Sequence, residues 1–250
     1  LSLFFVQEEI TFIFLFFFFL MRVFSSAEDV WIEGTAQPKE RITISSPVEE
    51  VVEEVFVEEG DNVVKGDVLA KLLSKRQELA VKKLEHLITK ARFEFEAVED
   101  LYAKKIESRA SYLEKKAELG SFEVDKELAE NDISERLIKS PSDGVIVYRL
   151  IDPGESAEKV EALFELIDAS SLKLVFFLTT DYLDQLKVGN EVVVDFPEVT
   201  SSSQGKAKLK FIDPQVDSRS GLFRVMFEFD NAEAKIKPGV RVRMKVPSES

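Results

Sequence analysis

The order of apolar and polar residues predicts short strands in two separated parts of the chain. Residues 46–72 and 140–166 each consist of short apolar segments that are interrupted by glycine turns. Residues 172–246 contain five or six further apolar segments, and alternation with a period of two is clearest in 206–212 and 223–229. This period places successive side chains on opposite faces of a strand. The last region, with one short helix near its start, therefore predicts a small closed β-barrel.

The first two strand-rich regions repeat each other at a constant offset of 94 residues. The matching positions are Ser46-Pro47 with Ser140-Pro141, Glu59-Gly60-Asp61 with Pro153-Gly154-Glu155, and Leu69 and Leu72 with Leu163 and Leu166. Each copy has only about 27 residues, which is too few to bury a core alone. We therefore expect the two copies to face each other in one β-sandwich. The tight turns are expected at five glycines, which are Gly60, Gly66, Gly144, Gly154 and Gly239.

The segment between the two copies is predicted to be helical. Residues 74–138 contain no proline and one glycine, and they are rich in Glu, Lys, Ala and Leu. Ser74 and Gln77 fit a capping box at the start of a first helix, and Ser108 is placed to cap a second one. Steps of three and four residues define an apolar stripe on each helix. The stripe residues are Leu84, Leu87, Ile88, Ala91, Phe95, Val98, Leu101 and Tyr102 in the first helix, and Ala110, Leu113, Ala117, Val124 and Leu128 in the second.

Two long helices with narrow apolar stripes are expected to pair as an antiparallel coiled-coil hairpin. Two interpretations of such a hairpin are open. It could serve only as a spacer, or the turn at its tip could contact a partner. Ordering a long hairpin costs conformational entropy and buries little surface, which favours the second interpretation.

The first 27 residues read as a targeting segment. Residues 10–21 form an uncharged apolar run, and residues 25–27 are small, as at a signal-peptidase site. The run is short for a membrane span, and no basic residue precedes it. The segment fits a cleaved signal peptide, a retained N-terminal membrane anchor, or a misassigned start of a cytoplasmic protein.

Composition removes several kinds of chemistry. The chain has no cysteine and one histidine, His86, which excludes thiol nucleophiles and makes multi-histidine metal sites improbable. A net charge of −14 argues against nucleic-acid binding. We expect no catalytic residue, no metal site and no cofactor. Seven acidic residues between Glu49 and Asp61 are expected on solvated strand faces, and a hard-cation site is the alternative.

Four motifs resemble those of membrane fusion proteins, also called periplasmic adaptor subunits, of the hemolysin D-like and RND-type efflux kind. Residues 57–70 are similar to V-x-x-G-D-x-V-x-K-G-D-x-L-A, and residues 138–146 are similar to I-x-A-P-x-D-G-x-V. Residues 211–217 and 222–225 are similar to I-x-P-x-V-D and the strand that follows it. Residues 237–240 are similar to L-x-P-G-M. The resemblance covers about residues 35–246 and is specific only in combination. It implies a mainly β protein, in which a lipoyl-like sandwich is split by the helical hairpin and followed by the barrel.

This resemblance implies seven segments, a set of partners and a location. The segments are a signal peptide or anchor (1–27), N-terminal strands joining the barrel (28–45), lipoyl-like half 1 (46–73), the hairpin (74–138), lipoyl-like half 2 (139–168), the barrel (169–246) and a tail (247–250). The implied partners are an inner-membrane transporter of RND or ABC type, an outer-membrane channel, and other copies of the chain in a ring, as a hexamer or trimer of dimers. The implied location is the periplasm, at the inner membrane. The alternatives are an envelope structural module without a transporter and a cytoplasmic carrier-domain subunit.

In relatives that dock an outer-membrane channel, the hairpin tip carries R-x3-L-x6-S. Leu101 and Ser108 have the matching separation, whereas Ala97 occupies the arginine position. The resemblance therefore implies a partner-binding tip at Leu101, Lys104, Lys105 and Ser108. The absent arginine leaves open an outer partner of a different kind. Since no lysine lies at the turn where carrier domains are modified, a swinging-arm cofactor is not expected, and Lys65 is expected to be a turn residue.

Overall fold

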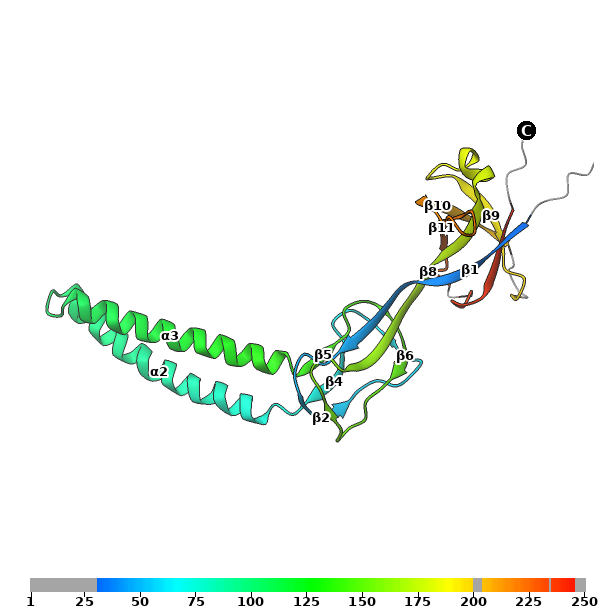
Figure 1. The fold of residues 1–250 in the computed structure, drawn as a ribbon. Helices are drawn as coiled ribbons and strands as arrows, with labels where there is room; N and C mark the ends of the chain where they lie inside the picture. Colours follow the sequence, from blue (N-terminus) through cyan, green and yellow to red (C-terminus); the bar gives the residue numbers. More distant parts are fainter. Residues whose placement is uncertain (1–30, 200–203, 234, 246–250) are drawn as a thin grey trace, which may run out of the picture. The chain divides into compact units, whose positions relative to one another are not determined.

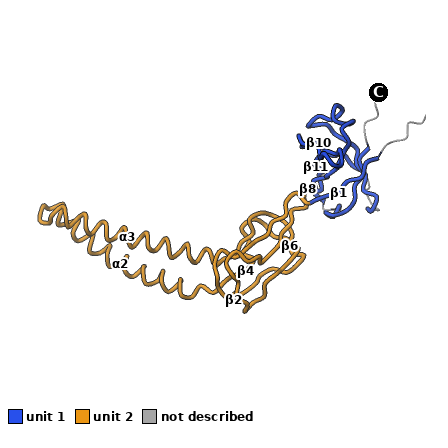
Figure 2. The backbone as a smooth tube through the Cα atoms, viewed as in Figure 1, with its two compact units in different colours: residues 1–37, 171–250 blue, residues 38–170 orange. Residues whose placement is uncertain are grey.

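The computed structural model describes residues 31–199, 204–233 and 235–245. The predicted targeting segment (1–27) and tail (247–250) lie outside these residues. The chain forms two compact units, residues 1–37 with 171–250 and residues 38–170 (Figure 2). Two long strands, β1 (Trp31–Ser45) and β8 (Ala162–Thr179), contribute to both units.

The second unit contains a β-sandwich and a pair of helices (Figure 1). Its other strands are β2 (Glu50–Val55), β3 (Asn62–Val63), β4 (Val68–Leu72), β5 (Leu137–Lys139), β6 (Gly144–Arg149) and β7 (Ser156–Ala157). One sheet has the order β5-β4-β2-β7, and the other pairs β3 with β6 and β6 with β8. Apolar side chains from both copies of the repeat are fully buried between them, including Leu69, Leu72, Ile146, Phe164 and Leu166.

The predicted repeat is confirmed by backbone hydrogen bonds that also repeat at the offset of 94 residues. Gly60 N–H donates to the carbonyl of Ile146 (2.8 Å), and Gly154 N–H donates to that of Val52 (2.9 Å). Similarly, Gly66 N–H donates to Ser140 and Val160 N–H donates to Ser46, both at 2.8 Å. In each pair of bonds, the two donor residues are 94 positions apart, and so are the two acceptor residues. The two copies therefore complete each other, as expected for halves too small to fold alone.

The five glycines expected at turns divide into two groups. Gly60, Gly66, Gly154 and Gly239 have φ between 91° and 99°, a region that side chains with a Cβ rarely adopt. Gly144 differs from the prediction, because it is the first residue of strand β6. A Cβ there would lie 2.5 Å from the carbonyl oxygen of Ile167. Close approach of neighbouring backbone, not turn geometry, requires glycine at this position.

One turn of the second copy has a left-handed residue, like its counterpart in the first copy, although that residue is not glycine. Val160 occupies the position of Gly66 and has φ of 69°. A left-handed conformation is unfavourable for an L-residue and more so for a β-branched one. The hydrogen bond from Val160 N–H to Ser46 fixes this backbone despite the strain.

We expect Val160→Gly to raise the free energy of unfolding by about 0.5 to 1 kcal/mol, because relief of left-handed strain exceeds the extra entropy of glycine. The matched change, Gly66→Ala, introduces a Cβ at φ of 96° and should lower stability by about 1 kcal/mol. Thermal melting followed by circular dichroism measures both. Equal shifts of the same sign would contradict the strain at Val160.

The helix pair consists of α2 (Lys75–Ala103) and α3 (Arg109–Ser134). The predicted capping box at Ser74 is wrong. Ser74 is the N-cap residue, but its hydroxyl donates to Glu78 Oε1 (2.9 Å) and accepts no backbone N–H. The predicted cap at Ser108 is confirmed, since its Oγ accepts a hydrogen bond from Ser111 N–H (3.1 Å).

The apolar stripe predicted for α2 faces α3, whereas the stripe predicted for α3 faces away from α2. Ala91 is buried in α2, and most other stripe residues are half-buried. The predicted α3 residues Ala110, Leu113, Ala117, Val124 and Leu128 are all exposed. The half-buried positions of α3 instead follow steps of three and four through Tyr112, Lys115, Leu119, Phe122, Lys126, Ala129 and Ile133. Two lysines thus occupy the contact seam, since their long aliphatic stems can pack there.

The first unit is a small barrel. Its other elements are the 3-10 helix η1 (Thr180–Gln185) and strands β9 (Glu191–Asp195), β10 (Gln204–Val216), β11 (Leu222–Asp230) and β12 (Arg241–Lys245). The strand order is β1-β12-β9-β10-β11-β8, and β1 also pairs with β8, which closes the barrel. Alternate residues point inward, and the core includes Phe176, Phe196, Phe223 and Phe227. The period-2 prediction for this region is confirmed.

Candidate functional site at the turn between α2 and α3

The turn that joins α2 to α3 is short and highly constrained. Lys105 adopts a left-handed conformation with φ of 60°. The carbonyl of Leu101 accepts hydrogen bonds from Ile106 N–H (2.9 Å) and Glu107 N–H (3.3 Å), and Lys105 N–H donates to Tyr102 (2.9 Å). These bonds make a Schellman motif, in which Lys105 is the left-handed C′ residue.

Aromatic packing supports this turn from within the helix pair. The rings of Tyr102 and Tyr112 stack with centroids 4.9 Å apart. Phe95 contacts the same Tyr112 ring at 5.6 Å. Such rings add rigidity beyond their buried area, so the turn has a firm base.

The four residues predicted for the tip lie close together in sequence, but they have different surroundings. Leu101 is half-buried in the seam, and Ser108 is occupied as the cap of α3. The Lys104 ammonium pairs with Asp100 one turn earlier in α2. Lys105 is exposed in the turn.

Sequence reasoning missed Ile106, whose exposed fraction is 70%. It lies between Lys105 and Ser108 and presents the most exposed apolar surface of the turn. No periodicity could reveal it, because a single residue in a five-residue turn belongs to no stripe. The available signal was its composition, a bulky aliphatic residue within a charged turn.

Ion pairs connect the two helices along the seam. Lys115 Nζ lies 2.8 Å from Glu118 and 2.7 Å from Glu94 of α2, and Lys126 Nζ lies 3.7 Å from Glu85 of α2. Hydrogen bonds to Glu118 and Glu94 raise the pKa of Lys115, and the hydrogen bond from Lys115 lowers the pKa of Glu94. Both shifts favour the charged forms, so Lys115 and Glu94 remain ionised within the seam.

The outer faces of the helices expose apolar residues and carry opposite charge. On α3, Leu113, Val124 and Leu128 are 49%, 55% and 61% exposed, and on α2 Leu79 and Phe93 are 56% and 74% exposed. Near the sandwich, residues 75–92 of α2 hold six bases and two acids, while residues 118–132 of α3 hold six acids and one base. Near the turn, residues 93–100 hold four acids and no base, while 109–117 hold three bases and one acid. The charge order therefore reverses along both helices.

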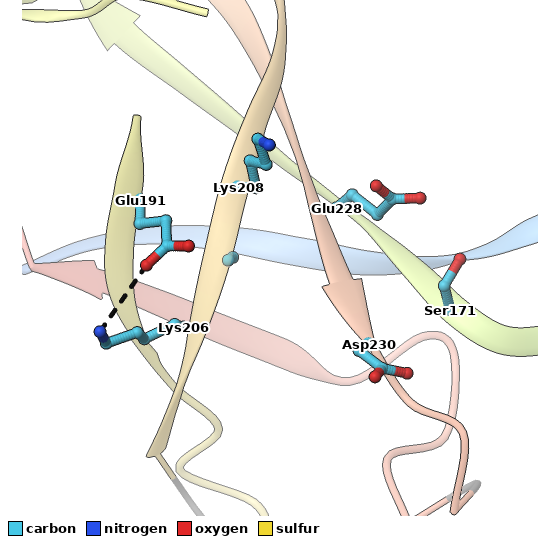
Figure 3. A pocket seen from close by; sticks show the side chains of 7 residues that line it. Ser171, Glu191, Lys206, Lys208, Glu228 and Asp230 are labelled. Carbon is cyan, nitrogen blue, oxygen red and sulfur yellow. Dashed lines mark ion pairs between the residues drawn. The ribbon is translucent and has the colours of Figure 1, made fainter. Parts of the chain in front are cut away.

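The barrel has a shallow charged pocket of about 390 Å³ on its outer surface (Figure 3). Three of its five charged residues, Glu191, Lys208 and Glu228, are direct cross-strand neighbours, and this ladder continues across four strands to Lys173 of β8. Such alternation stabilises a sheet surface. The lining offers no nucleophile paired with a base, so we assign no chemistry to it.

The other residues weighed for chemistry are distributed over the surface. Of the seven acids between Glu49 and Asp61, only Glu50 is half-buried, near Arg136 at 3.8 Å. Within the described ranges, no three His, Asp or Glu side chains are grouped so as to hold a metal ion. His86 is exposed on α2, and Lys65 lies in a turn, where its N–H donates to Asp143 (2.8 Å). Among the helices described, none is both long and apolar enough to span a bilayer.

Comparison with known families agrees with this architecture. Residues 40–168 match the model of CzcB-like barrel-sandwich hybrid domains, and residues 178–250 match that of CusB-like beta-barrel domains. The first match covers more than half of the chain. The chain therefore belongs to the CzcB-like family of membrane fusion proteins.

Individual relatives are distant but extend over most of the chain. It is 27% identical over 231 residues to the nodulation protein NolF of Rhizobium meliloti, with 86% of this chain and 62% of that protein covered. It is 24% identical over 226 residues to the cobalt-zinc-cadmium resistance protein CzcB of Cupriavidus metallidurans, with 76% and 42% covered. The chain thus spans about half the length of these relatives.

Solved structures share the fold. A chimera of MacA with the alpha-hairpin domain of Pseudomonas aeruginosa MexA has a TM-score of 0.76 at 17% identity, covering 88% of this chain and 81% of the chimera. A membrane fusion protein of Streptococcus pneumoniae has a TM-score of 0.70 at 18% identity, covering 88% of this chain and all of that one. At such identity, the likeness concerns the fold alone.

Proposed function

We propose that the chain is a non-enzymatic periplasmic adaptor that links an inner-membrane transporter of RND or ABC type to an outer-membrane channel. The observation that carries this proposal is the order of parts, a sandwich interrupted by a helix pair and followed by a barrel. A carrier or enzyme has no use for an interruption at the turn between the two halves. An adaptor uses it, because the interruption supplies length away from the sandwich.

Each part has a role in the proposal. The lipoyl-like halves at 46–73 and 139–168 form a rigid base for the segment 74–138, which acts as an antiparallel coiled-coil hairpin. The barrel at 169–246, with strands from 28–45, faces the transporter. Residues 1–27 act as signal peptide or anchor and place the protein in the periplasm at the inner membrane. The hairpin tip, with Leu101, Lys104, Lys105 and Ser108, faces the outer partner.

The outer faces of the helices support self-association into a ring. The ion pair Glu85–Lys126 places residues 75–92 of α2 beside 118–132 of α3, and Glu94–Lys115 places residues 93–100 beside 109–117. Suppose that neighbouring copies lie side by side with their helices pointing the same way. Then α2 of one copy meets α3 of the next, and the two helices carry opposite charge both near the sandwich and near the turn. Such head-to-tail contacts close into a ring when the rotation permits.

The direct test is export in the source cell. One relative is a cobalt-zinc-cadmium resistance protein, so these cations are the first cargo to examine, followed by dyes and detergents. Deletion of the gene should lower the inhibitory concentration of at least one cargo several-fold, and the intact gene should restore it. Unchanged resistance to every cargo, together with a weakened envelope, would instead support a structural module without a transporter.

A further inference from the structure

The turn between α2 and α3 departs from the usual chemistry of helix ends at two adjacent residues. The left-handed C′ position of a Schellman motif is usually glycine, because other residues are strained there. Here it is Lys105, with φ of 60°. A glycine would close the same turn with less strain, so closure alone does not explain the lysine.

The second departure is at the next residue. In a Schellman motif, an apolar residue at C″ frequently packs against the residue at C3, which here is Leu101. The backbone bond from Ile106 N–H to the Leu101 carbonyl is present at 2.9 Å. Nevertheless the Ile106 side chain is 70% exposed. The apolar group is thus held at the surface by a rigid turn that does not bury it.

The other predicted tip residues have local roles that account for them. Ser108 caps α3, and Leu101 lies in the seam while its carbonyl closes the turn. Lys104 pairs with Asp100. In the described part of the chain, the side chains of Lys105, Ile106 and Arg109 have no comparable local role, although the backbone of Lys105 and Ile106 closes the turn. Strained or exposed residues on a rigid support are typical of binding sites.

The charge of the turn indicates the kind of surface that it fits. Residues 104–109 contain three bases and one acid, although the whole chain has a net charge of −14. Two such turns would repel each other, which disfavours tip-to-tip contact between copies. An acidic surface on a different protein would attract the turn and orient it.

We propose that Ile106 is the apolar anchor of the adaptor tip, with Lys105 and Arg109 as its cationic border, and that it inserts into an apolar pocket bordered by carboxylates on a different protein. This inference rests on the proposed function, because it assumes that the turn meets the outer partner. It adds the contacting residue and the chemistry of the opposing surface. Leu101 and Ser108, by contrast, shape the turn.

The first experiment places a photo-crosslinking amino acid at position 106 of the full chain in the source cell. The expected product joins position 106 to an envelope protein, at a segment that contains apolar and acidic residues. Adducts only with other copies of this chain would overturn the inference. Ile106→Leu should preserve an adduct made from position 107, which lies in the same turn but outside the anchor and its border, and Ile106→Ser should reduce it at least several-fold. Val188→Ser, at another exposed aliphatic residue, is the matched control and should leave it unchanged.

The second experiment separates docking from stability. Lys105→Gly should raise the melting temperature, because it removes the strain, and lower the adduct yield from position 106, because it removes a charge. A purely structural role for Lys105 would leave the yield unchanged. Lys105→Glu should abolish the adduct, and reversal of an acidic residue at the crosslinked segment of the partner should restore it. Failure of that restoration would overturn the acidic border.

Export assays of the same strains distinguish failure of this inference from failure of the proposed function. If deletion of the gene impairs export and Ile106→Ser restores it fully, the anchor is wrong and the adaptor role stands. If deletion leaves export unchanged, the adaptor role is wrong, and the crosslinks alone decide whether Ile106 binds an acidic partner.

Discussion

Replacing Leu113, Val124 and Leu128 together with serine should abolish self-association of the chain while leaving its helices folded. These side chains are on the outer face of α3 and are not part of its seam with α2. Their removal costs the fold little, because surface substitutions usually change stability by less than about 0.5 kcal/mol each. Their loss from an interface would remove its apolar centre, where a few residues supply most of the binding energy. Sedimentation over a range of concentrations measures assembly, and circular dichroism measures the helices.

The matched control is Leu119→Ser, a leucine of the same helix that lies half-buried in the seam. This change should destabilise the helix pair and leave the outer face intact.

Because the chain has no cysteine, Phe93→Cys and Ala117→Cys in one chain should also form disulfide-linked multimers. High salt should weaken assembly, since the facing charges are screened. A wild-type chain that remains monomeric at every concentration would contradict the proposed ring.

The sandwich could be predicted from sequence because its repeat consists of residue types, such as turn glycines and core leucines, that have specific structural roles. Two structural demands recur at the offset of 94 residues: a positive φ at Gly60 and Gly154, and burial of Leu69 and Leu163. The repeat in the sequence therefore predicts that its two copies pair. Gly144 was harder to interpret. Glycine is needed at this position because the carbonyl of Ile167 leaves no room for a Cβ, and the two residues are neighbours only in the folded chain.

The orientation of α3 could not be predicted from its own pattern, because the helix has two stripes. The more apolar stripe, at Ala110 to Leu128, suggested the buried face and is in fact exposed. The true seam includes Lys115 and Lys126, which looked solvated in sequence. Their carboxylate partners Glu94 and Glu85 belong to α2 and become visible only when the two helices are paired.

Replacing Phe227 with alanine should lower the free energy of unfolding of the barrel by about 3 to 5 kcal/mol, the range for a deleted core phenylalanine. Phe227 is 1% exposed in β11, and its ring meets that of Phe176 edge-on at 5.7 Å. The only tryptophan, Trp31, lies in β1 of the same unit, with the Arg243 guanidinium over its ring. Tryptophan fluorescence during urea denaturation therefore reports on the barrel. Helical circular dichroism reports on the other unit and should change far less.

Phe177→Ala provides the matched control, because Phe177 is on the neighbouring strand β8 and is 57% exposed. It removes the same atoms from a side chain that packs on one side only, so the loss should stay within about 0.5 kcal/mol. The two variants differ in burial and not in chemistry. Equal urea midpoints for both would mean that the inward and outward faces of the β8–β11 pair had been misassigned. Since the register pairs Phe227 with Leu174, and Phe177 with Arg224, that error would require a shift of one residue in the ladder.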